Sequence, residues 1–153
     1  MRIIIMGQQA FGKDVLSKIV GAELDTVVAV YCEPDKEGKP TDPIKEMAIS
    51  LGIPVHQPNN FQDLDVLEQI KNFDCDLMIM AFVNIFVPEK VCTIPKFGSI
   101  CFHPSLLPLH RGPSAVNWPI IMGSSKSGFS WFYPTDGLDE GDVLMSEECS
   151  IEP

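Results

Sequence analysis

Acid–base chemistry in this sequence could come from a histidine that closes a strand-like run. His103 follows the apolar residues Ile100–Phe102, and Pro104 and Pro108 after it interrupt both helix and sheet. We therefore expect His103 at the carboxyl end of a strand, the edge at which open α/β sheets place their sites. Histidine suits this work because its side chain can hold or release a proton near neutral pH.

A second loop, residues 136–142 (Asp-Gly-Leu-Asp-Glu-Gly-Asp), follows another strand-like run and offers carboxylates. One of them could pair with a protonated His103, which would then donate to a developing oxyanion. The glycines around Asp139 allow tight backbone shapes near a ligand, whereas Asp136 and Asp142 could cap turns. The residue types leave open which aspartate acts, and the spacing does not show that this loop meets His103.

The elements that must position these residues are short apolar runs that alternate with amphipathic segments. We predict strands at residues 2–6, 26–32, 53–56, 75–82, 100–103, 129–133 and 143–151. We predict helices at residues 13–20, 44–51, 61–73 and 113–122, with a short one after Pro88 and a turn at 7–12. Asp42 and Asn60 are the expected N-caps of the second and third helices. This alternation predicts an α/β fold with a doubly wound sheet.

Composition limits the class of protein. The 153 residues, 45% of them hydrophobic, predict one globular domain, and the net charge of −10 comes with no basic cluster of the kind that nucleic-acid binding requires. The five cysteines include no C-x-x-C pair, which favours reduced thiols over disulfides or a zinc site. No run approaches the roughly 18 apolar residues that span a bilayer. We expect a soluble, cytoplasmic protein without a metal, a membrane or a nucleic-acid partner.

Both loops also carry a family signature. The run His103-Pro-Ser-Leu-Leu-Pro108, followed by Arg111-Gly112 and by Gly-Leu-Asp-Glu-Gly-Asp at 137–142, resembles the 10-formyltetrahydrofolate-dependent formyltransferases. That family includes glycinamide ribonucleotide transformylase, methionyl-tRNA formyltransferase, amino-sugar formyltransferases and the amino-terminal hydrolase domain of 10-formyltetrahydrofolate dehydrogenase. The chain is closest in character to that hydrolase domain. The resemblance covers essentially the whole chain. It implies a Rossmann-like, mainly parallel sheet of the formyltransferase type with an antiparallel strand near the C-terminus.

The resemblance also assigns catalytic roles. By position, His103 is the general acid and oxyanion stabiliser, and Asp139 positions the nucleophile. Cys101 stands where the family has a catalytic asparagine, which the hydrolase domain also lacks; this departure sorts the chain toward that branch. A thiol is a weaker hydrogen-bond donor than an amide. Cys101 is therefore a candidate catalytic residue whose alternative role is that of a small packing side chain.

Two loops are implied to bind the pterin ring through backbone groups between apolar walls, an arrangement that suits a flat heterocycle. The residues are Phe82, Val83, Asn84, Ile85 and Phe86 in the first loop, and Tyr133, Asp136, Gly137 and Leu138 in the second.

From this resemblance we expect residues 1–153 to be a formyltransferase catalytic domain that is truncated or minimal at its C-terminus. The expected activity cleaves the N10-formyl group of 10-formyltetrahydrofolate and transfers it to an amine or to water in one-carbon metabolism. The alternatives are transfer to an amino sugar or to methionyl-tRNA, and a non-catalytic folate-binding module. The acidic charge disfavours tRNA, whose phosphates call for a basic surface.

Overall fold

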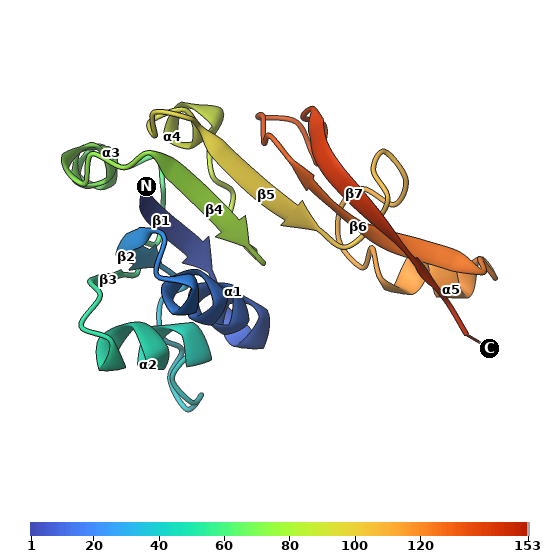
Figure 1. Ribbon diagram of the computed structural model, residues 1–153, viewed down its shortest axis with the longest axis horizontal. Helices are drawn as coiled ribbons and strands as arrows, with labels where there is room; N and C mark the ends of the chain where they lie inside the picture. Colours follow the sequence, from blue (N-terminus) through green and yellow to red (C-terminus); the bar gives the residue numbers. More distant parts are fainter. Residues whose placement is uncertain (153) are drawn as a thin grey trace. The chain divides into compact units, whose positions relative to one another are not determined.

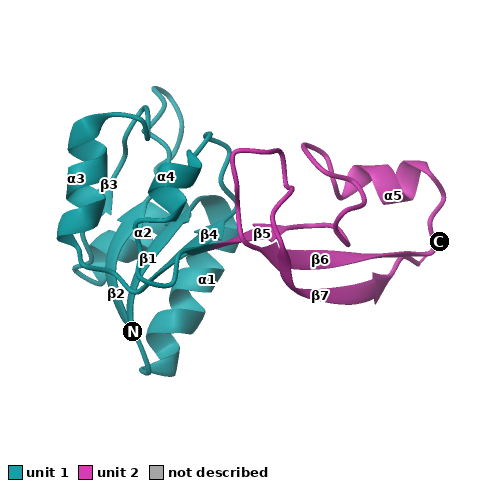
Figure 2. Ribbon diagram, turned by 90° about the horizontal axis from the view of Figure 1, so that it is seen from above, with its two compact units in different colours: residues 1–99 teal, residues 100–153 magenta. Residues whose placement is uncertain are grey.

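The computed structural model describes residues 1–152. It separates into two compact units, unit 1 (Met1–Ser99) and unit 2, which begins at Ile100 (Figure 2). Unit 1 contains β1 (Arg2–Gly7), α1 (Gln9–Ala22), β2 (Thr26–Tyr31), α2 (Pro43–Ser50), β3 (Val55–His56), α3 (Leu64–Asn72), β4 (Leu77–Ala81) and α4 (Glu89–Cys92). The chain then forms β5 (Ser99–His103), α5 (Asn117–Ile121), β6 (Lys126–Phe132) and β7 (Val143–Ser150).

Unit 1 is a parallel sheet in the order β3-β2-β1-β4, with helices on both of its faces. Figure 1 shows α1 and α2 on one side of these strands and α3 and α4 on the other. The central strand β1 places Ile5 beside Val30 of β2 and Ile79 of β4. A strand that is buried on both faces has a continuous run of apolar residues, and such runs predicted these strands from the sequence. The doubly wound arrangement is confirmed.

Unit 2 is an antiparallel ribbon in which β6 pairs with β5 on one side and with β7 on the other. Cys101 lies opposite Phe132 and His103 lies opposite Ser130. All eight residues of β7 are exposed. The predicted antiparallel strand near the C-terminus is therefore present, and β6 begins at Lys126, three residues earlier than predicted.

The first helix begins earlier than its apolar spacing indicated. Residues 7–12 were predicted to form a turn, but α1 already begins at Gln9 and includes Gly12. A Cβ at Gly12 would lie 3.2 Å from the Gly7 carbonyl carbon and 3.2 Å from Ile44 Cδ1, so glycine lets this helix approach its neighbours closely. The predicted cap Asp42 is confirmed, because its carboxylate accepts from the Ile44 N–H at 3.0 Å.

Two other helix predictions were too long. The helix predicted for 61–73 begins at Leu64, with Asp63 rather than Asn60 at the N-cap position. Asn60 instead accepts a hydrogen bond from the Gln62 N–H at 2.9 Å, which closes a turn before the helix. The helix predicted for 113–122 is reduced to α5, in which Pro119 lies in the first turn, where a missing N–H costs no helical bond. Among the described residues, none of the helices has both the length and the apolar composition of a membrane span.

Candidate active site

His103 is held at the end of β5 by acceptors on both sides of its ring. The residue is only 6% exposed. Its Nε2 lies 2.9 Å from the His110 carbonyl oxygen, and its Nδ1 lies 3.4 Å from Oδ2 of Asp139. A carbonyl and a carboxylate only accept hydrogen bonds, so an imidazolium can donate to both, whereas a neutral ring can donate to one.

Asp139 is the carboxylate that meets His103. It lies in a loop closed by a 2.9 Å hydrogen bond from the Tyr133 N–H to the Asp142 carbonyl. A Cβ at Gly141 would overlap the Tyr133 carbonyl oxygen, so this closure requires glycine there. Asp139 itself has a left-handed backbone with φ of 49°. The structure thus brings Asp139 into contact with His103, and the catalytic roles of the two residues stay a prediction.

A second loop fixes the Asp139 carboxylate. The Gly112 N–H donates to Asp139 Oδ2 at 2.7 Å, and Arg111 lies 3.7 Å from Glu140. Both contacts of the Asp139 carboxylate therefore use Oδ2. Within residues 1–152 no hydrogen bond involves Oδ1, which leaves this oxygen able to accept from a bound molecule.

Cys101 lies two residues before His103 on β5, so both side chains leave the strand on the same side. It is half-buried, and its Sγ lies 3.7 Å from the Phe102 carbonyl oxygen. The structure thus places Cys101 on the same face of β5 as His103, and its role stays a prediction.

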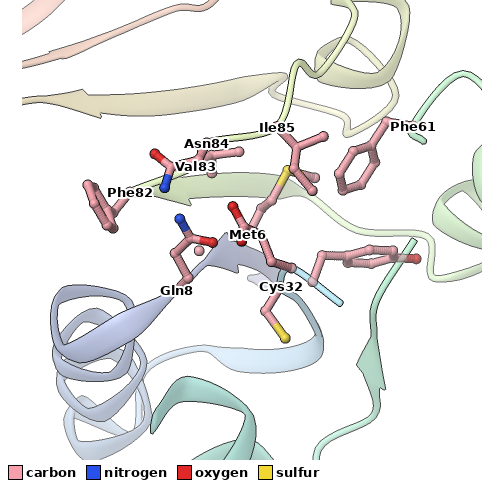
Figure 3. A pocket seen from close by; sticks show the side chains of 11 residues that line it. Met6, Gln8, Cys32, Phe61, Phe82, Val83, Asn84 and Ile85 are labelled. Atoms are coloured by element: carbon pink, nitrogen blue, oxygen red, sulfur yellow. The ribbon is translucent and has the colours of Figure 1, made fainter. Parts of the chain in front are cut away.

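The residues of the first predicted folate loop follow β4 in unit 1. Phe82, Val83, Asn84 and Ile85 line a small pocket together with residues at the ends of β1 and β2 (Figure 3). Phe86 is not among its lining residues and is exposed. Phe82 has φ of 63°, an unusual backbone conformation for a bulky side chain.

Gln8 is a lining residue that the sequence analysis did not single out. Its side chain points toward the loop of Val83 and Asn84 in Figure 3, and the residue is 3% exposed. Its Nε2 is buried without a hydrogen-bond partner in residues 1–152. The available signal was a glutamine directly after a buried strand, at the edge where such sheets bind ligands.

The second predicted folate loop lies in unit 2, in the same loop as Asp139. Tyr133, Asp136, Gly137 and Leu138 precede Asp139 in this loop, and the Gly137 N–H donates to Thr135 Oγ1 at 3.3 Å. The structure therefore places this set in the loop of Asp139, and it places Phe82–Ile85 in the pocket that Gln8 also lines.

Metal and disulfide chemistry were not expected. In the described part of the chain, no group of three His, Cys, Asp or Glu side chains could hold a metal ion. None of the five cysteines forms a disulfide within residues 1–152; Cys32, Cys75 and Cys92 are buried, and Cys149 is exposed. Burial raises the pKa of the Cys32 thiol to about 11, with a further rise from the nearby Asp42 carboxylate.

A family comparison identifies the architecture around this histidine–aspartate pair. The formyl transferase family model matches residues 1–153. This chain belongs to the formyl transferase family. The fold agrees: the phosphoribosylglycinamide formyltransferase of Bacillus halodurans superposes with a TM-score of 0.82 at 22% identity, over 99% of this chain and 81% of that one.

Curated members of the formyl transferase family are longer than this chain. The chain is 39% identical over 158 residues to cytosolic 10-formyltetrahydrofolate dehydrogenase of Homo sapiens, covering 100% of this chain and 17% of that protein. It is also 39% identical over 154 residues to methionyl-tRNA formyltransferase of Fusobacterium nucleatum, covering 99% of this chain and 50% of that protein. The chain thus spans half or less of these relatives.

Proposed function

We propose that residues 1–153 form a catalytic domain that takes the formyl group from 10-formyltetrahydrofolate and passes it to water or an amine. The observation that carries this proposal is the contact of His103 Nδ1 with Asp139 Oδ2 at 3.4 Å. Acid–base catalysis of formyl transfer requires a proton donor and a proton acceptor in contact, and His103 and Asp139 are such a pair. Membership of the formyl transferase family supports the reaction class.

In this proposal Asp139 prepares the nucleophile. Its Oδ2 is fixed by the Gly112 N–H and by His103, and its Oδ1 accepts a proton of the water or amine that attacks the formyl carbon. His103 donates to the tetrahedral oxyanion and then protonates N10 as the C–N10 bond breaks. The products are tetrahydrofolate and either formate or a formylated amine. Cys101 supplies at most a weak additional donor.

For the folate we assign the pterin ring to backbone groups of Phe82–Phe86 and of the loop with Tyr133, Asp136, Gly137 and Leu138. The buried Gln8 amide, which lacks a partner, supports a polar ligand against the first of these loops. We further propose a cytoplasmic location. We also propose no nucleic-acid partner, and the net charge of −10 supports this second point.

Methionyl-tRNA is the second candidate acceptor. Its support is the 39% identity to a methionyl-tRNA formyltransferase, equal to the identity to 10-formyltetrahydrofolate dehydrogenase. The two acceptors separate in one assay, because transfer to methionyl-tRNA leaves formyl on the aminoacyl group and hydrolysis releases formate.

The test is to incubate purified protein with 10-formyltetrahydrofolate and to follow tetrahydrofolate and formate, with and without amino sugars or methionyl-tRNA. Replacing His103 by Gln or Asp139 by Asn should lower turnover by about 10²–10⁴-fold, the usual contribution of general acid–base catalysis. Asp142→Asn in the same loop is the matched control and should keep the rate. Folate binding without turnover under every acceptor would reject catalysis and identify a binding module.

A further inference from the structure

The proton of His103 that faces away from Asp139 is directed by a backbone group. The acceptor of Nε2 is the carbonyl oxygen of His110, at 2.9 Å. Because a carbonyl cannot donate, Nε2 carries the proton in this arrangement. This hydrogen bond fixes the ring in the orientation in which Nδ1 faces Asp139.

The direction of that carbonyl depends on an unusual backbone conformation. His110 has φ of 54°, in the left-handed region that glycine and asparagine tolerate best. Gly112 and Ser114 follow with φ of 79° and 63°. Non-glycine residues remain in this region only where their surroundings hold them there.

Hydrogen bonds on both sides of His110 supply that restraint. The Ser105 hydroxyl donates to the Leu109 carbonyl at 2.6 Å, and the Gly112 N–H donates to Asp139 at 2.7 Å. Ser105 is itself tied to β6, because the Ser130 hydroxyl donates to its carbonyl at 2.8 Å. Ser105 and Ser130 are fully buried.

The His110 imidazole takes no part in this arrangement. In residues 1–152 it makes no hydrogen bond, ion pair or ring contact, and only the main-chain carbonyl of this residue meets His103. The backbone conformation and the side chain of residue 110 can therefore be tested separately.

We propose that His110 is a positioning residue whose left-handed backbone, and not its imidazole, holds the His103 ring at Nε2 and so keeps Nδ1 turned toward Asp139 and the reacting formyl group. This inference rests on the proposed function, since it assigns the aim of the general acid in that reaction. In the reaction the imidazolium donates its Nδ1–H to the formyl oxygen and then to N10, while the Nε2–H bond to the His110 carbonyl is kept. The C–N10 bond breaks, N10 takes the Nδ1 proton, and solvent returns a proton to Nδ1.

The experiment compares three substitutions at one position. Glycine and asparagine tolerate positive φ, so H110G and H110N should keep kcat within about twofold although both lack the imidazole. Valine is β-branched and resists this conformation. H110V should lower kcat by up to about 10²-fold with little change in KM, as expected when a reacting group is misplaced by about 1 Å. If H110V does not fold, H110A takes its place, with a smaller loss.

A second readout does not depend on turnover. Long-range ¹H–¹⁵N NMR spectra report which His103 nitrogen carries a proton and how it is hydrogen-bonded. The Nε2 signal should match the unmodified protein in H110G and H110N and shift in H110V. Loss of kcat in H110G as large as in H110V, or an unshifted Nε2 signal in H110V, would overturn the proposal. Absence of turnover in the unmodified protein would instead reject the proposed function. The NMR result alone would then decide the proposal about His110.

Discussion

Gln8 and His103 each lie at the end of a strand, one in unit 1 and one in unit 2, and both are almost fully shielded from solvent. Their polar atoms are treated in opposite ways. The Gln8 Nε2 has no partner in the described chain, whereas both ring nitrogens of His103 face acceptors. A buried donor without a partner costs stability until water or a ligand pairs with it. The contrast separates a group already oriented for chemistry from a group that only an outside molecule can satisfy.

The cores of the two units also differ in the share of buried polar side chains. Unit 1 buries apolar side chains completely, among them Ile4, Ile5 and Leu16. In unit 2 the buried set includes His103 and the hydroxyls of Ser105 and Ser130. We therefore expect stability to depend on apolar burial in unit 1 and on hydrogen bonds in unit 2, and four substitutions test this comparison.

Ile4→Ala should have the largest effect. Ile4 is fully buried in β1 between β2 and β4, and truncation of such a side chain leaves a cavity that costs about 2–5 kcal/mol of unfolding free energy. Urea denaturation measures the loss. Ile49→Ala on the exposed side of α2 is the control and should change stability by no more than about 0.5 kcal/mol. Equal losses at the two positions would contradict the role assigned to the unit 1 core.

Ser130→Ala should come next. It removes the hydroxyl that donates to the Ser105 carbonyl and accepts from the Leu107 N–H at 3.1 Å. The buried groups left unpaired should cost about 1–3 kcal/mol. Ser146→Ala is the matched control, because it removes only the 2.9 Å hydroxyl contact with Ser130 from an exposed strand. If both variants unfold at the same denaturant concentration, the hydrogen-bonded network is not what stabilises unit 2.

Gln8→Met should have a small effect of opposite sign. The substitution removes a buried donor that has no partner, so unfolding free energy should stay constant or rise by about 1 kcal/mol. Gln57→Met is the matched glutamine, since Gln57 donates to the Glu33 carbonyl at 2.6 Å and accepts from Lys45 at 2.8 Å. Gln57→Met should destabilise by about 1 kcal/mol. A loss at Gln8 as large as at Gln57 would mean that the Gln8 amide is already satisfied in solution.

His56→Phe should act chiefly on the pH dependence of stability. Burial lowers the pKa of His56, whose ring lies 5.0 Å from Tyr31 and 5.5 Å from Phe73. The unfolding free energy that neutral His56 contributes is therefore present above its unfolded-state pKa of about 6.5. It is lost as the pH falls through the lowered pKa of the folded state. Phenylalanine keeps the ring contacts without the titration. Thermal melts from pH 8 to 5 should show the unmodified protein losing more stability than the variant, and parallel curves would rule out this role.

Much of the fold could be predicted because burial leaves a pattern in the sequence. The continuous apolar runs that became β1 and β4 were recognised, and Asp42 before Pro43 marked the start of α2. The start of α1 was missed because its first turn carries no apolar spacing, and Gly12 there serves close packing rather than a turn.

In the candidate site, some side chains could be predicted from the sequence, whereas the backbone groups could not. His103 was found from its place after a strand, and Asp139 was chosen among three aspartates only through the family resemblance. The His110 carbonyl and the Gly112 N–H could not be predicted, because every residue carries these groups and only the loop conformation directs them. Gln8 was overlooked because a missing hydrogen-bond partner is a property of three-dimensional packing.

The exposed edge strand β7 has a practical consequence through Cys149. Burial or a raised pKa slows the reaction of a thiol with electrophiles, and this applies to Cys32, Cys75 and Cys92. Cys149 is the exposed thiol. It lies on β7 opposite Ser127 of β6, in the same unit as His103. A maleimide fluorophore or a nitroxide would attach there first. The chain thus carries its own attachment point for a spectroscopic reporter in unit 2, without an engineered cysteine.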